Sequence, residues 1–144
     1  MSAATIPSPA FGTARHLAPS PGALWGGRVL LAVGVLFLLF DITVKLMVSP
    51  EAVAGTTALG YAAHHLPVLA ALEVVCLVLY LIPRTAPIGA VLWTGYLGGA
   101  IATHLRIDNP LFSHILFPVY VAAILWGALY LRDARVRALI ASPR

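Results

Sequence analysis

The chain has 144 residues, of which 60% are hydrophobic and only 10% are charged, and its mean hydropathy is +0.94. Soluble domains carry roughly 25% charged residues, so this composition predicts a protein of the lipid bilayer. The net charge is +4, from nine Lys and Arg against five Asp and Glu. The basic residues are spread singly between apolar runs and do not form the clustered patch of a nucleic-acid-binding domain. The single cysteine, Cys76, excludes an internal disulfide, a CxxC redox pair and a cysteine-rich zinc site.

Residues 1–24 are rich in Ser, Pro, Ala and Thr and have no apolar core of the kind that signal peptides carry. We predict that they form a disordered cytoplasmic tail. Four apolar segments follow within residues 25–137, each close to the roughly 20 residues that a spanning helix needs. The sequence therefore predicts an all-α, integral membrane four-helix bundle, with spans at residues 28–48, 66–82, 86–105 and 111–131.

The segments between and after the spans are short, with one exception. Residues 49–65 form a long connection, in which we expect a short interfacial helix, and residues 138–144 form a second cytoplasmic tail. Pro67, Pro87 and Pro110 fall in predicted first turns, where the missing N–H is harmless. Pro118 lies inside the last span and should kink it.

The positions of Lys and Arg predict the orientation in the membrane, because cytoplasmic flanks carry an excess of these residues. Seven of the nine basic residues fall on one side: Arg15, Arg28, Arg84, Arg132, Arg135, Arg137 and Arg144. We therefore predict that both termini are cytoplasmic and that the long connection faces outward.

Three ionisable residues lie within the spans, namely Asp41, Lys45 and Glu73. A charge at the centre of a spanning helix is costly and often marks function. At 1.5 Å per residue, Asp41 and Glu73 lie about 10 Å inside the outer boundary, and Lys45, His104 and His114 lie roughly 2–6 Å inside it. All four helices thus contribute a polar side chain at similar depth, which predicts one shared site.

Each of these residues also has a structural interpretation. Asp41 and Lys45 have the i, i+4 spacing of a self-neutralising pair, and Glu73 needs a partner on another helix unless it stays protonated. His114 and Arg106 lie at helix ends, where side chains reach toward the interface. If these residues form a functional site, we expect two of them, Glu73 and Asp41, to be catalytic. We expect the others to bind the ligand: Lys45, His104, His114 and Arg106.

The third span and the turn after it complete the predicted site. Gly95 and Gly99 form a GxxxG face suited to close helix contact, whereas His104 lies on nearly the opposite side. The Asn109-Pro110 pair should make the turn, because the residue before proline is pushed out of the helical region. We expect Asp108 to cap the last helix or to pair with Arg106.

A metal site is a further alternative. The chain's histidines and carboxylates include enough ligands for zinc, but no HxxH or HExxH spacing supports one. A haem held by His104 and His114 would lie too close to the membrane surface. We therefore predict no metal site.

The chain resembles the DoxX-like family of bacterial membrane proteins over residues 28–140. The resemblance rests on "ALEVVCLVLYLIPRTAPIGAVLWTGYLGGAIATHLR" and "FPVYVAAILWGALYLRDARVRAL". The positions that match the family pattern are Lys45, Glu73, Ala100 with His104, and Arg132-Asp133. The resemblance implies a four-helix protein of the bacterial inner (plasma) membrane, in a family named for a subunit linked to a quinone-reducing oxidase.

Three functions remain open from the sequence. The first is a membrane partner of a redox protein that binds a lipid-soluble molecule, expected to be a quinone, through donors such as Lys45, His104 or His114. The second is a stand-alone enzyme in which Glu73 or Asp41 acts as a general acid or base, as in an isomerase. The third is a small transporter, for which 144 residues are few unless the chain forms a homo-oligomer.

Overall fold

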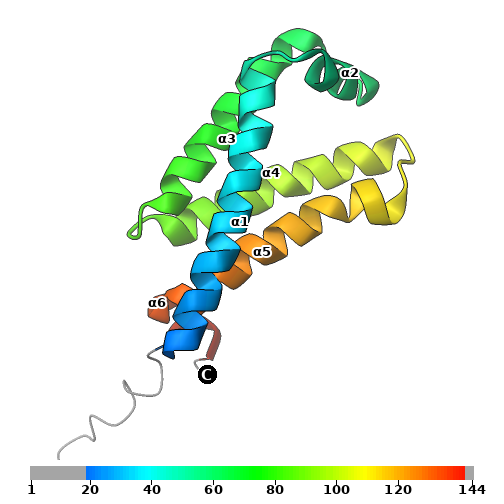
Figure 1. The fold of residues 1–144 in the computed structure, drawn as a ribbon. Helices are drawn as coiled ribbons and strands as arrows, with labels where there is room; N and C mark the ends of the chain where they lie inside the picture. The colour runs from blue at the N-terminus through cyan, green and yellow to red at the C-terminus, as the bar shows by residue number, and fades with distance from the viewer. Residues whose placement is uncertain (1–18, 142–144) are drawn as a thin grey trace, which may run out of the picture.

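The computed structural model describes residues 19–141. Within this range the chain forms six α-helices and no strand (Figure 1), which confirms the all-α prediction. The elements are α1 (Pro21–Leu46), α2 (Pro50–Ala58), the short 3-10 helix η2 (Ala63–His65), α3 (Leu66–Leu81), α4 (Ala86–Arg106), the π-helical turn η3 (Leu111–Ile115), α5 (Phe117–Arg132) and α6 (Ala134–Ala141).

Four of the described segments are long and apolar enough to cross a membrane, as predicted: Pro21–Leu46, Ala63–Leu81, Ala86–Arg106 and Leu111–Arg132. Their outward faces carry exposed apolar side chains, such as Leu36 and Phe40 at 68% exposure each. Such faces suit contact with lipid rather than water. The length and apolar surface of these four helices indicate a multi-pass membrane protein.

The ends of the membrane domain differ from the prediction. Helix α1 begins at Pro21 because the Ser20 side chain accepts a hydrogen bond from the Ala23 N–H at 3.2 Å and caps the helix. Residues 21–24 therefore belong to the first span, and residues 138–141 belong to α6 rather than to a tail. The remainder of the predicted tails, residues 1–18 and 142–144, lies outside the described residues.

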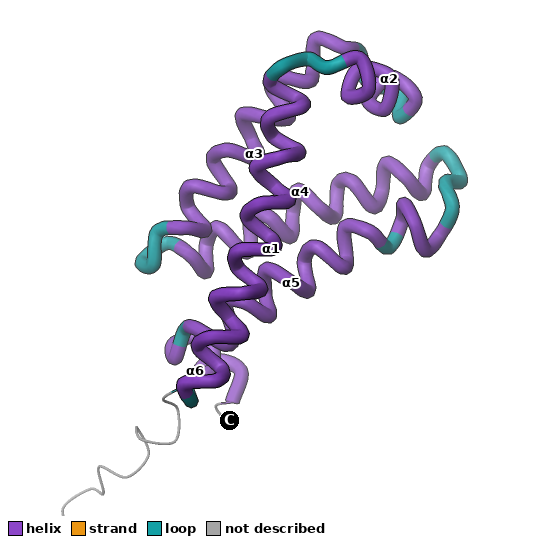
Figure 2. The backbone as a smooth tube through the Cα atoms, in the orientation of Figure 1, coloured by secondary structure: helices purple, strands orange, loops and turns teal. Residues whose placement is uncertain are grey.

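The long connection contains the helix that its sequence predicts. Helix α2 repeats the start of α1, since Ser49 accepts a hydrogen bond from the Ala52 N–H at 3.1 Å and Pro50 occupies the first turn. The chain then turns at Gly60, whose φ of +84° is readily adopted only by glycine. Figure 2 shows this loop at the same end of the bundle as the turn between α4 and α5.

The four spanning helices pack in a ring. Helix α1 lies against α3 and α5, and α4 closes the ring between α3 and α5. The core is formed by buried side chains from all four helices, including Leu38, Tyr80, Trp93 and Leu125. The α1–α3 pair and the α4–α5 pair diverge toward the α2 end of the bundle (Figure 1).

The closest helix contact is not the predicted one. A Cβ at Gly89 would lie 2.3 Å from the main-chain nitrogen of Tyr80, so α4 approaches α3 at Gly89. A Cβ at Gly95 or Gly99 would meet nothing within 4 Å. The prediction of a GxxxG contact is therefore wrong within the described chain, because this face of α4 borders an open space.

The helix of the last span is interrupted just before Pro118, the residue at which the sequence predicts a kink. Residues Leu111–Ile115 form the π-helical turn, and α5 starts anew at Phe117 with Pro118 in its first turn. The expected role of Asp108 is wrong. No side chain caps η3, and Arg106 donates to the Leu59 main-chain oxygen at 2.6 Å instead of pairing with Asp108.

Candidate functional site

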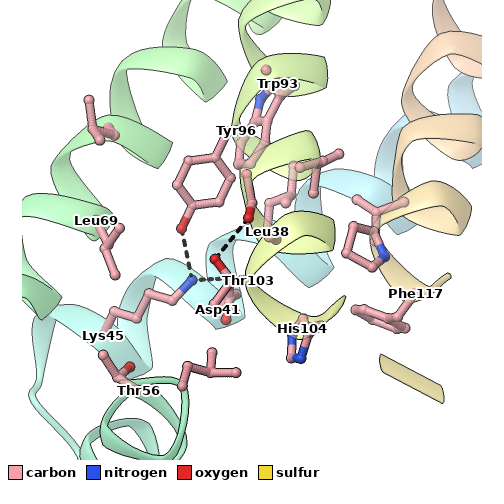
Figure 3. A pocket seen from close by; sticks show the side chains of 18 of the residues that line it. Leu38, Asp41, Lys45, Thr56, Leu69, Trp93, Tyr96, Thr103, His104 and Phe117 are labelled. Atoms are coloured by element: carbon pink, nitrogen blue, oxygen red, sulfur yellow. Dashed lines mark hydrogen bonds and ion pairs between the residues drawn. The ribbon is translucent and has the colours of Figure 1, made fainter. Parts of the chain in front are cut away.

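The charged residues of the spans meet at Lys45. Its Nζ donates to Asp41 Oδ2 at 2.6 Å, to Glu73 Oε1, and to the Tyr96 hydroxyl at 3.4 Å (Figure 3 shows the Asp41 and Tyr96 contacts). These contacts join α1, α3 and α4. Glu73 therefore has the partner on another helix that its position in the span led us to expect.

The helical spacing of these residues explains how they meet. Asp41 and Lys45 are one turn apart on α1, so both reach the same side. On α3, Glu73 shares a buried stripe with Cys76 and Tyr80, which points its carboxylate into the bundle. A buried carboxylate needs a charged or hydrogen-bonding partner, and Lys45 supplies one.

Glu73 is fully buried, and only one of its two oxygens is paired among the described residues. Oε1 accepts hydrogen bonds from Lys45 and from the Tyr96 hydroxyl, whereas Oε2 has no partner there. With both carboxylates ionised, Asp41, Glu73 and Lys45 carry a formal charge of −1. The cluster is therefore a polar centre inside an apolar bundle.

A cavity of about 440 Å³ opens beside this cluster, toward the α2 end. Asp41, Lys45 and Tyr96 lie at one edge of the cavity, and Trp93 and Phe117 are part of its wall (Figure 3). The wall also includes Phe37, Gly95 and Gly99. Glu73 is absent from the wall. The structure therefore places Asp41 in contact with the cavity and Glu73 behind it.

A second hollow of about 380 Å³ adjoins the first. The two share Asp41, Lys45, Thr56, Leu59 and His104, and the second adds side chains of α2 and of the turn before α5. The two hollows therefore form one site, with one lobe within the bundle and the other under α2.

The two histidines line this site to different extents. His104 borders both hollows and His114 borders the second, with their ring centroids 5.6 Å apart. Asn109 Nδ2 lies 2.8 Å from His104 Nδ1, and Ser113 Oγ lies 2.8 Å from His114 Nδ1. Arg106 lines neither hollow, because it extends to Leu59.

Two aromatic residues of the site were missed from the sequence. Tyr96 bonds both Lys45 and Glu73, and Trp93 is 1% exposed in the cavity wall. A tyrosine hydroxyl within a span requires a polar partner, and this signal could have added Tyr96 to the cluster. The sequence offers no comparable signal for Trp93.

No group of three His, Cys, Asp or Glu side chains within residues 19–141 is arranged to hold a metal ion. The exposed His64 and His65 rings lie 4.2 Å apart and line neither hollow. The site is therefore best described by its hydrogen-bonding groups and its apolar walls.

Comparison with known proteins adds the family. No curated protein and no solved structure gives a significant match to the chain. The sequence profile of the DoxX-like family matches residues 29–128, a range that includes Asp41, Lys45, Glu73, Tyr96 and His104. The chain therefore belongs to the DoxX-like family and is a membrane protein with apolar spanning helices.

Proposed function

We propose that the protein binds a lipid-soluble ring compound of the quinone class in the cavity beside Lys45. The observation that carries the proposal is the cavity itself, about 440 Å³ in volume, with apolar walls and polar groups gathered at one edge. Pockets for small molecules typically measure roughly 300–1,000 Å³ and combine apolar walls with a few placed polar groups.

The arrangement of the walls suits a molecule with one polar and one apolar end. Phe37, Trp93 and Phe117 offer aromatic surfaces for a ring or an isoprenoid tail. Asp41 and His104 lie at the junction with the second hollow and offer hydrogen bonds to ring substituents. In this proposal Lys45, Glu73 and Tyr96 hold Asp41 in place, and a separate redox protein exchanges electrons with the ligand.

Two glycines of α4 provide a matched test. Gly99 lines the cavity and Gly98 does not, and a Cβ at either position meets nothing within 4 Å. Gly99→Phe should fill the cavity without disturbing the helix packing, and Gly98→Phe should place its ring outside it. Binding of decylubiquinone would be measured by equilibrium dialysis against protein in lipid nanodiscs.

We expect Gly99→Phe to weaken binding at least tenfold, roughly the effect of removing the ligand's main apolar contact, and Gly98→Phe to bind like the parent. Native mass spectrometry of the parent should also show a co-purified ring compound. Equal binding by the parent and both variants would place the ligand elsewhere, and no binding by the parent would refute the proposal.

A second candidate function is a membrane enzyme that uses Asp41 as a general acid or base. It is favoured by the contact of Asp41 with both hollows, where a bound molecule comes within its reach. In this candidate Glu73 is a positioning residue, because it touches Lys45 and Tyr96 but not the cavity. Loss of turnover in Asp41→Asn with unchanged ligand binding would support it.

A further inference from the structure

The hydrogen-bond donors of Lys45 and Tyr96 all have acceptors within the protein. The Lys45 ammonium has three N–H groups, and it has three partners in Asp41, Glu73 and the Tyr96 hydroxyl. The Tyr96 hydroxyl in turn donates its one proton to Glu73. Neither Lys45 nor Tyr96 therefore has a proton left to donate to a ligand.

Asp41 carries an unused acceptor oxygen at the cavity edge. Asp41 Oδ2 accepts from Lys45, whereas Oδ1 accepts no hydrogen bond within residues 19–141. The Asp41 side chain is 34% exposed and lines both hollows. An ionised carboxylate accepts hydrogen bonds and cannot donate them, so the ligand must supply the proton.

We infer that the cavity selects a ring compound whose polar end is a neutral hydroxyl, such as the reduced quinol form, over the carbonyl form of the same compound. This inference rests on the proposed function and assigns the chemical form of its ligand. A hydroxyl donates to Asp41 Oδ1 in a charge-assisted hydrogen bond. A carbonyl oxygen in the same place faces a carboxylate oxygen and is repelled.

The same contacts disfavour a cationic ligand. An ammonium group bound to Asp41 would lie close to the Lys45 ammonium, which is 2.6 Å from the other oxygen of that carboxylate. Two like charges at such separation repel each other strongly in an apolar site. A neutral donor satisfies Asp41 without this repulsion.

His104 provides a matching donor for the oxygen of the ligand hydroxyl. With Asn109 Nδ2 donating to His104 Nδ1, the proton of the neutral imidazole ring is on Nε2. Nε2 has no partner within the described part of the chain. One ligand hydroxyl can then donate to Asp41 and accept from His104, which a methyl ether or a quinone cannot do.

The test compares two pairs of ligands that differ only at the polar end. The first pair is 4-decylphenol and 4-decylanisole, in which a methyl group replaces the hydroxyl proton. The second pair is decylubiquinol and decylubiquinone, measured without oxygen. Dissociation constants are determined by equilibrium dialysis with the full chain in nanodiscs, for the parent, Asp41→Asn and the control Glu51→Gln, whose residue is exposed on α2.

We expect the parent and Glu51→Gln to bind each hydroxyl compound roughly tenfold or more tightly than its partner, the size of a charge-assisted hydrogen bond. In Asp41→Asn this preference should fall to about twofold or less, while the affinity for 4-decylanisole stays unchanged and shows that the cavity is folded. Equal affinity within each pair, or tighter binding of the quinone, overturns the inference and leaves the proposed function standing. Absence of binding by all four compounds refutes both.

Discussion

Lys45 of α1 and Glu73 of α3, which are 28 positions apart in the sequence, form an ion pair inside the bundle. The pair is nearly shielded from solvent, since Lys45 is 17% and Glu73 0% exposed at the side chain. Removing one partner of a buried pair leaves an uncompensated charge, which costs more than the pair itself contributes. We therefore expect replacement of either Lys45 or Glu73 alone to destabilise the fold.

Lys45→Met should lower the free energy of unfolding by about 3–5 kcal/mol, because it leaves two carboxylates without their cation. Chemical unfolding in mixed micelles measures the change. Leu46→Met is the matched control, since Leu46 is the next residue and is 53% exposed. A loss for Lys45→Met no larger than that of the control would show that the ion pair contributes little.

Tyr96→Phe should destabilise the protein by about 1–2 kcal/mol, because Glu73 loses a buried hydrogen bond while the ring volume is retained. The same unfolding measurement applies. Tyr120→Phe removes a hydroxyl from an exposed tyrosine of α5 and should leave stability unchanged. Equal stability of the two variants would contradict the role of Tyr96 in holding Glu73.

Gly89→Ala should be severely destabilising, by roughly 4 kcal/mol or more, because its Cβ would collide with the main chain of Tyr80 at 2.3 Å. Gly98→Ala should instead stabilise α4 by about 0.5–1 kcal/mol, since its Cβ meets nothing within 4 Å. The comparison is made by thermal unfolding of both variants. Similar melting temperatures would show that α3 and α4 are not in close contact at Gly89.

The start of α6 should depend on pH through Asp133. Its carboxylate accepts hydrogen bonds from the Arg135 side chain and main-chain N–H, which lowers the pKa of Asp133 below its ordinary value of 3.8. A lowered pKa contributes stability above that ordinary value, and the contribution is lost as the pH falls through the folded pKa.

Asp133→Asn should therefore melt below the parent at neutral pH, and the difference should shrink as the pH is lowered from 3.8 through the folded pKa. Thermal unfolding followed by circular dichroism over a pH series measures this. A difference that stays constant down to the lowest pH would show that the amide disturbs α6 for a reason other than charge.

The orientation of the bundle remains a prediction from the basic residues. A reporter fused after Arg144 should be active in the cytoplasm, and one inserted within residues 50–63 should be active on the opposite side. Arg28, Arg84, Arg132 and Arg135 lie near the α6 end of the spans, which supports this expectation. A cytoplasmic signal from the loop insertion would reverse the orientation.

The apolar runs and the prolines were enough to predict the four spans, the helix in the long connection and an irregularity of the last span at Pro118. The ionic core of the site was also predictable, because a charge within a span must find a partner and few partners were available. Helix capping by Ser20 extended α1 beyond its apolar run, so the N-terminal boundary was wrong.

The shape of the site could not be predicted from the sequence. Helical spacing places Glu73 on the inner face of α3, but only the packing of α1 and α4 decides that Lys45 and Tyr96 cover it from the cavity. The GxxxG sequence gave no indication of whether a helix or an open space lies beside it. Both questions depend on how far apart the helices are held.

The complete use of the Lys45 protons within the protein has a consequence for ligand exchange. A molecule that bonds to the unused atoms, Asp41 Oδ1 and His104 Nε2, enters or leaves without breaking any contact that joins the helices. Exchange of the ligand then does not require the contacts of Lys45 to open. Substitutions among the apolar wall residues could change which molecule is bound while the ionic core continues to hold the fold.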